Sequence, residues 1–337
     1  MTDKPQDTVP HRLGSRIPTP PDPRKRHAPL PVWEKNRGER DPQAPSRLDK
    51  IMASASYRRA DQDTEFLERE EMRGIRLQLE YEKAELILRE HGVDHTIVAF
   101  GSTRITEPAE AERKRTEAAA ALAANPGDAA LAAKLAIAER IVAKSGYYDV
   151  AREFGRIVAN SNGPPANCRM LLMTGGGPGM MEAANRGAHD VGGRTVGLNI
   201  DLPHEQYPNC YLTPELALRF RYFALRKLHF MLRARAIVAF PGGFGTMDEL
   251  FEALTLIQTR TIRPLPIILV GEQFWRGAIN FEHFVDEGVI DAEDLDIFWF
   301  AETAQEIWDG ILDWHRLNGS PLPTSGPTTG PMTGDSP

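Results

Sequence analysis

The sequence has few cysteines, no long apolar run and no excess of positive charge. Among its 337 residues are two cysteines, Cys168 and Cys210, too few for a disulfide framework, which predicts a reducing, cytoplasmic compartment. No apolar stretch reaches the length of a membrane span or forms the core of a secretion signal. The net charge of −7 disfavours a nucleic-acid surface, which is normally basic. We therefore expect a soluble protein with a small-molecule ligand and without nucleic-acid or membrane partners.

Chemistry is expected in the stretch Phe223–Thr255, where three glycines lie together in one turn. This stretch predicts a helix, a buried strand (Ala236–Phe240), a glycine turn (Pro241–Thr246) and a second helix that carries Asp248 and Glu249. Glycines let the backbone turn sharply and approach a ligand closely. The amide groups at the start of the following helix favour an anion. The stretch therefore predicts a phosphate cradle with a carboxylate one turn away.

A second glycine turn, Gly175–Gly179, lies between a predicted strand (Met170–Thr174) and a predicted helix that carries Glu182. Neither turn has the third glycine of the dinucleotide fingerprint, because Asp248 and Glu182 stand in its place. Neither has the Gly-Lys-Ser/Thr of a Walker A loop, and the nine histidines show no metal-ligand spacing. The sequence thus favours a phosphorylated small molecule without a cofactor or metal.

Strands that alternate with helices predict an α/β fold, a Rossmann-like doubly wound parallel sheet with helices on both faces. The expected strands are His95–Phe100, Met170–Thr174, Thr195–Ile200, Ala236–Phe240 and Pro266–Val270, with a short apolar segment at Ile297–Phe300. The expected helices are Asp63–His91, a hairpin over Pro108–Lys144, Tyr147–Ala159, Met180–Ala188, Pro214–Arg233, the one following the Pro241–Thr246 turn, Gln273–Glu287 and Thr303–Leu317.

Composition divides the chain into four parts. We expect a disordered Pro-rich tail (1–46), an N-terminal helical extension (47–92), a catalytic domain (93–317, with a helical insertion at about 106–146) and a disordered tail (318–337). An apolar stripe on the extension contains Met72, Ile75, Leu79 and Leu86 and would pack on the catalytic domain or across a dimer.

Polar side chains follow the first predicted strand. Ser102 and Arg104 lie where ligands bind in an open parallel sheet, so they are candidates to hold a phosphate or a ribose. An ordinary strand-to-helix turn with a capping Ser or Thr explains the same residues. Glu182 also has two explanations, a functional role or a purely structural one, because helix dipoles favour acids in the first turn.

Arg226-Lys227 together with Pro241–Glu249 (PGGFGTMDE), and Thr174–Glu182 (TGGGPGMME), resemble the two signature motifs of the Lonely Guy (LOG) family, in its longer bacterial subgroup. The resemblance covers roughly His95 to Trp314. It implies a Rossmann-like homodimer or larger homo-oligomer that hydrolyses the N-glycosidic bond of nucleoside 5′-monophosphates such as AMP and cytokinin riboside monophosphates. Relatives are often labelled lysine decarboxylases, but the sequence shows no pyridoxal phosphate site.

Carried over by position, the resemblance implies a catalytic pair and a set of substrate contacts. The pair is Arg226 and Glu249. The substrate-binding candidates, from the two glycine turns, the first strand end and the matched positions, are Gly242, Gly243, Gly245, Thr246, Lys227, Thr255, Glu205, Ser102, Arg104, Gly176 and Gly177.

Chemistry supports the pair independently. Cleavage of a ribosyl–base bond passes through an oxocarbenium-like centre, which a carboxylate such as Glu249 stabilises while it activates water. Arg226 would hold the phosphate or orient Glu249, because guanidinium is a poor acid. The alternative is a non-catalytic carrier or sensor of a phosphorylated nucleotide or cofactor, which needs the glycine turn but not Glu249. Neither reading predicts which base is preferred.

Overall fold

A computed structural model describes residue 24 and residues 41–161, 170–203 and 207–322. The chain divides into two compact units, one ending at Arg69 and the other beginning at Glu70. In the first unit, the described residues form short helices: α1 (Ala44–Met52), the 3-10 helices η2 (Ala55–Tyr57) and η3 (Ala60–Gln62), and α2 (Thr64–Leu67). The Asp63 side chain starts α2 by accepting a 3.1 Å hydrogen bond from the amide of Phe66.

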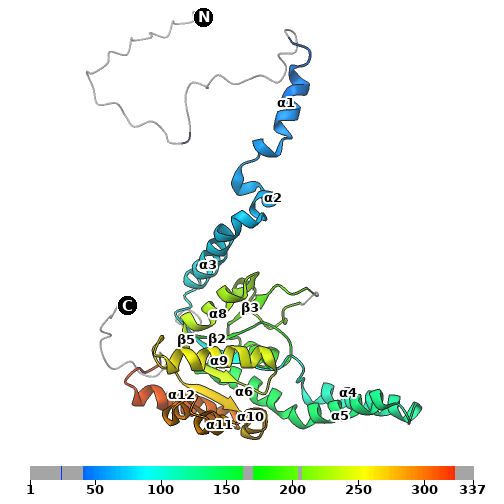
Figure 1. The fold of residues 1–337 in the computed structure, drawn as a ribbon, viewed down its shortest axis with the longest axis vertical. Helices are drawn as coiled ribbons and strands as arrows, with labels where there is room; N and C mark the ends of the chain where they lie inside the picture. Colours follow the sequence, from blue (N-terminus) through cyan, green and yellow to red (C-terminus); the bar gives the residue numbers. More distant parts are fainter. Residues whose placement is uncertain (1–23, 25–40, 162–169, 204–206, 323–337) are drawn as a thin grey trace, which may run out of the picture. The chain divides into compact units, whose positions relative to one another are not determined.

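The second unit contains one parallel sheet of seven strands in the order β4-β3-β2-β1-β5-β6-β7. Three of these strands, β2, β3 and β5, are labelled in Figure 1. The strands are β1 (His95–Phe100), β2 (Met170–Thr174), β3 (Thr195–Ile200), β4 (Ala217–Phe220), β5 (Ala234–Ala239), β6 (Ile267–Val270) and β7 (Phe298–Ala301). Each pair of neighbours is parallel. The predicted fold class is confirmed, as are the exact bounds of the first three strands.

The strand order reverses direction beside β1. The chain builds outward from β1 to β4 and then returns to place β5 on the other side of β1. Open α/β sheets bind ligands at such a switch point, outside the carboxyl ends of the strands. The residues that follow Phe100 and Ala239 therefore lie where a ligand site is expected.

Alternate strand residues pack into two separate cores, one on each face of the sheet. Val98 and Phe100 belong to the core beneath α3, α8 and α9, and Ile97 and Ala99 to the core beneath α6, α7 and α12. The helices of the second unit are α3 (Arg73–Glu90), α4 (Pro108–Ala124), α5 (Ala129–Lys144), α6 (Gly146–Ser161), α7 (Met180–Asp190), α8 (Phe223–Leu232), α9 (Phe244–Gln258), α10 (Glu272–Ala278), α11 (Phe281–Asp286) and α12 (Ala304–Leu317).

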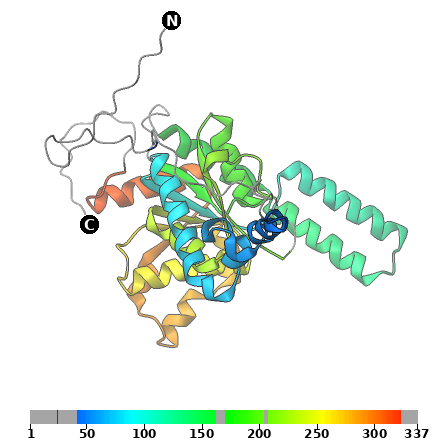
Figure 2. The same cartoon turned by 90° about the horizontal axis from the view of Figure 1, so that it is seen from above.

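The helical insertion is a hairpin of α4 and α5, and it extends away from the sheet (Figure 2). Asp128 begins α5 by accepting hydrogen bonds from the amides of Ala130 and Leu131, at 2.8 and 3.1 Å. The side chain of Asp128 therefore caps the start of α5.

The predicted helix over Pro214–Arg233 is wrong in its first half. A short 3-10 helix, η6 (Pro214–Leu216), leads into the edge strand β4, and α8 begins only at Phe223. Leu218 and Phe220 are buried in the core while Ala217 and Arg219 are exposed, which is the period of a strand. The Leu- and Ala-rich composition concealed this alternation.

Two further predicted helices are interrupted. Asn280 accepts a hydrogen bond from the amide of His283 at 3.1 Å and starts α11, so the helix predicted over Gln273–Glu287 is two helices. The helix predicted over Asp63–His91 is α2, the 3-10 helix η4 (Glu70–Met72) and α3.

The face of α3 that packs on the sheet also differs from the predicted stripe. Its buried residues are Ala84 and Leu88, whereas Ile75, Leu79 and Leu86 are exposed. In the part of the chain that the structure describes, no helix is both long and apolar enough to cross a membrane.

Candidate functional site

Three turns meet at the switch point. The amide of Ser102 donates to the Pro241 carbonyl at 3.0 Å, and the amide of Phe240 donates to the Phe100 carbonyl at 2.9 Å. The amide of Met180, at the start of α7, donates to the Ser102 carbonyl at 3.0 Å. Backbone hydrogen bonds therefore fix the end of β1, the second glycine turn and the Pro241 turn against one another.

These turns border a cleft of about 600 Å³, the size of a small-molecule site. The predicted site residues that line it are Ser102, Arg104, Arg226, Gly243, Gly245, Thr246 and Glu249. The structure thus brings together both members of the predicted catalytic pair and most of the predicted phosphate loop.

The Pro241–Thr246 turn presents backbone amides to the cleft. Helix α9 begins at Phe244, so the amides of Phe244 and Gly245 have no acceptor within the helix. A Cβ on Gly242 would lie 2.1 Å from Thr246 Oγ1, so this glycine makes room for the threonine rather than lining the cleft. The arrangement suits an anion at the positive end of α9.

Glu249 lies on α9 with 4% of its surface exposed, and it opens onto the cleft. Burial raises the pKa of this carboxyl, and the cations Lys227 and Arg226 oppose that rise. A buried carboxyl that opens onto a cleft is the kind of group that works as a base or charge stabiliser.

Arg226 is held by three contacts. Its Nε donates to the Leu198 carbonyl at 2.8 Å, and its guanidinium carbon lies 5.2 Å from the centre of the Phe230 ring. A Cβ on Gly175 would be 2.6 Å from Nη2 of Arg226 and 2.9 Å from Sδ of Met181, so a side chain at this position would displace the guanidinium. Burial lowers the pKa of Arg226, whereas Glu249 and Asp248 oppose this, and the guanidinium stays protonated. It is a fixed positive charge in the cleft wall.

Lys227 points toward α9 and does not line the cleft. Its Nζ lies 3.0 Å from Asp248 Oδ2, 3.2 Å from Glu249 Oε2 and 2.8 Å from Glu252 Oε2. Burial lowers the pKa of Lys227, but hydrogen bonds and attraction from these carboxylates outweigh it, so the net shift is upward. Lys227 therefore contacts the carboxylate of Glu249 without itself lining the cleft.

Three other predicted contacts lie outside the cleft lining. Thr255 lines a separate apolar groove of about 260 Å³, and its Oγ1 donates to the Phe251 carbonyl at 2.7 Å. Gly176 and Gly177 do not line the cleft, and their carbonyls accept hydrogen bonds from Asn209, at 2.9 and 3.0 Å. Glu205 lies outside the described residues.

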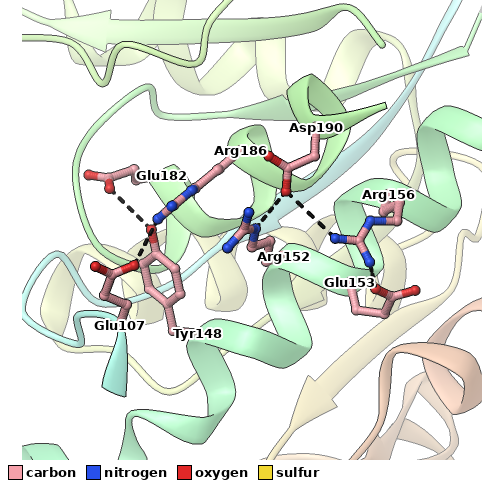
Figure 3. Close-up of polar contacts among 8 residues, drawn as sticks. All are labelled: Glu107, Tyr148, Arg152, Glu153, Arg156, Glu182, Arg186 and Asp190. Atoms are coloured by element: carbon pink, nitrogen blue, oxygen red, sulfur yellow. Dashed lines mark hydrogen bonds and ion pairs between the residues drawn. The ribbon is translucent and has the colours of Figure 1, made fainter. Parts of the chain in front are cut away.

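Glu182, the acid of the second glycine turn, is absent from the cleft lining. Its Oε1 accepts a 3.1 Å hydrogen bond from Tyr148 on α6, within a network of charged side chains (Figure 3). Burial raises the pKa of Tyr148 to about 12, with Arg186 acting in the opposite direction. The two glycine turns therefore differ, because only Glu249 opens onto the cleft.

The sequence reasoning missed several residues that line the cleft: Gly175, Met181, Asn199, Ile200, Leu202 and Phe223. Asn199 had a readable signal, since it is a polar residue near the end of a buried strand, as Ser102 is. Phe223 and Leu202 had no such signal, because their place at the cleft depends on the unpredicted strand β4. Leu202 lies in the loop before this strand, and Phe223 begins α8 just after it. Within the described residues, no cluster of His, Cys, Asp and Glu has the arrangement of a metal site.

The sheet order and the cleft at its switch point define a Rossmann-like fold with a candidate site for a small anionic ligand. A family model described as "Possible lysine decarboxylase" matches residues 181–311. Cytokinin riboside 5′-monophosphate phosphoribohydrolase LOG3 of Arabidopsis thaliana is 30% identical over 169 residues, which cover 49% of this chain and 74% of that protein. LOG4 of the same plant has the same identity and coverage. The chain belongs to the LOG family.

A solved structure of the Moco carrier protein from Chlamydomonas reinhardtii is also similar, at 17% identity and a TM-score of 0.37. The similarity covers 66% of this chain and 99% of the carrier protein's chain.

Proposed function

We propose that this protein hydrolyses the N-glycosidic bond of nucleoside 5′-monophosphates to a free base and ribose 5-phosphate. The observation that carries the proposal is a buried carboxylate, Glu249, that opens onto the same cleft as the amides at the start of α9. Membership of a family whose curated relatives are named phosphoribohydrolases supports the same reaction.

The 5′-phosphate would bind the amides of Phe244 and Gly245 and the Thr246 hydroxyl, with Arg226 as the second source of positive charge. Binding energy from this remote group would position the ribose for reaction. The donors are backbone amides and a packed guanidinium, so they are already in place before the ligand arrives.

Glu249 would act at the anomeric carbon. As the C1′–N bond breaks, its electron pair leaves with the base, and positive charge develops on the ribose ring. The ionised carboxylate stabilises this charge and accepts a proton from the attacking water, whose oxygen bonds to C1′. The departing base takes up a proton and Glu249 loses the proton that it accepted, so the net reaction adds one water across the C1′–N bond.

The test is to incubate the purified chain with AMP, GMP, CMP and isopentenyl-AMP and to measure free base by chromatography. We expect release from at least one of them, and a fall in kcat of about 10²–10⁴-fold in Glu249→Gln. Nucleotide binding should survive in that variant, because the phosphate contacts are elsewhere.

Glu182→Gln is the matched control. It makes the same chemical change at the corresponding helix start of the other glycine turn, outside the cleft. It should keep full activity. Stabilisation of the folded chain by nucleotides without any release of base would instead favour a carrier or sensor.

We also propose that the protein is a cytoplasmic homo-oligomer, as the low cysteine content and the family resemblance imply. Light scattering on the eluting peak of a sizing column measures the mass, and a monomer would contradict this part of the proposal.

A further inference from the structure

The α4–α5 hairpin has a groove of its own, of about 410 Å³. On the α4 side its floor consists of Ala111 and Ala118, which are 1% and 5% exposed. On the α5 side its wall contains Ile137, which is 57% exposed, and Ile141. Because the floor has only methyl side chains, the space between the helices stays open.

Positive charge predominates around this groove. Arg104, Lys114 and Lys134 line it, against one carboxylate, Glu117. That carboxylate forms an ion pair with Arg113, and Lys114 pairs with Glu110 at 3.3 Å. Within the described residues, no ion pair to Arg104 or Lys134 is found. Two cations at the groove, Arg104 and Lys134, therefore have no ion-pair partner among the residues that the structure describes.

Arg104 lines both the groove and the catalytic cleft. Its backbone amide donates to Ser102 Oγ at 3.1 Å, in the loop fixed against the glycine turns. At the base of the hairpin, Arg186 on α7 donates to Glu107 at 2.8 Å, which ties the start of α4 to α7 (Figure 3). The backbone of Arg104 is thus anchored at both ends of its loop, and its side chain lies between two cavities.

We propose that this groove is a second anion site, which binds a phosphorylated small molecule and is coupled to the cleft through Arg104. Arginine and lysine together supply the donors that phosphate needs, and the exposed isoleucine offers an apolar surface to the rest of the ligand. An occupant that attracts the Arg104 guanidinium withdraws it from the cleft, so the two ligands compete for one cation. The site lies outside the cleft and does not depend on the proposed hydrolysis.

The test is calorimetric titration of the full-length chain with inorganic pyrophosphate. Gly245→Trp blocks the cleft, because a side chain at this position has open space in front of it and Gly245 lines the cleft. In this variant we expect pyrophosphate still to bind at one site. Adding Lys134→Glu should weaken that binding at least about tenfold, the loss expected for a charge-assisted contact.

Lys144→Glu is the matched control. It makes the same charge change on the same helix, at a residue whose Nζ bonds only the Arg140 carbonyl at 2.9 Å and which does not line the groove. It should leave the affinity for pyrophosphate unchanged. Equal weakening by Lys144→Glu and Lys134→Glu would show a diffuse charge effect and overturn the proposal.

Absence of pyrophosphate binding in folded Gly245→Trp would overturn it as well. If Gly245→Trp does not fold, the chain without that change decides, since Lys134→Glu should then reduce two binding sites to one and Lys144→Glu should keep both. A chain that binds pyrophosphate in the groove but releases no base from any nucleotide would support the groove and refute the hydrolysis.

Discussion

Replacement of Lys227 by methionine should destabilise the protein by withdrawing a charge from Glu249. Lys227 Nζ lies 3.2 Å from Glu249 Oε2, and both side chains are largely shielded from water. With an effective dielectric constant of about 20, their attraction is at most roughly 5 kcal/mol, and the cost of desolvating the pair offsets part of it. We expect Lys227→Met to lower the free energy of unfolding by about 2–4 kcal/mol, measured by urea denaturation.

The same change should move the pH dependence of activity. Burial raises the pKa of Glu249 and Lys227 opposes that rise, so its removal raises the pKa further. If hydrolysis needs the ionised carboxylate, the acidic limb of kcat/KM moves to higher pH. The stability lost in Lys227→Met depends on the negative charge of Glu249. The loss should therefore be present near neutral pH and vanish in acid, where Glu249 is protonated in both folded and unfolded chains.

Lys144→Met is a suitable control, because it removes a lysine whose Nζ donates to the Arg140 carbonyl and pairs with no carboxylate of the described residues. In a Glu249→Gln background, Lys227→Met should cost clearly less stability, which a double-mutant cycle measures. A Lys227→Met variant with a raised KM but an unchanged pH profile would refute this reasoning. Lys227 would then contact the substrate, as the family resemblance implies.

Arg226→Lys should raise KM for the nucleotide about tenfold or more in steady-state assays, since lysine reproduces neither the Leu198 contact nor the stacking on Phe230. Gly175→Ala should impair activity in the same assays through displacement of Arg226, and unchanged kinetics would contradict the contact inferred there. The acidic limb of the wild-type pH profile should lie above the range of an ordinary carboxyl group, because burial raises the pKa of Glu249.

Most of the fold could be predicted because the buried parallel strands are uniform. Strands such as Met170–Thr174 are buried along their whole length, and a glycine turn or polar residue marks where each one ends. The edge strand β4 lacked both signals. It has four residues, of which every second one is buried, and the segments before and after it contain residues with high helix propensity. Tertiary pairing with β3 decided its conformation.

In the candidate site, too, features set by local structure could be predicted, whereas those set by tertiary packing could not. Sequence placed Glu249 and the Pro241–Thr246 turn because a turn and the helix it starts are local structures. It could not separate Lys227 from Arg226, since adjacent helix residues point about 100° apart, and only packing shows which one faces the cleft. It left the role of Glu182 open between a helix-terminal acid and a functional one, because the partner of Glu182 is Tyr148, on another helix.

The close fit between Gly175 and Arg226 joins two motifs that are far apart in the sequence. While the arginine is retained, no amino acid with a side chain can replace this glycine without displacing it. In a family member without the arginine, the remaining close contact of such a Cβ is the Met181 sulfur, at 2.9 Å, which a flexible methionine can relieve, so other amino acids can replace the glycine. The amino acid found at this one position would therefore sort related chains into those that retain the cleft's fixed cation and those that have abandoned it.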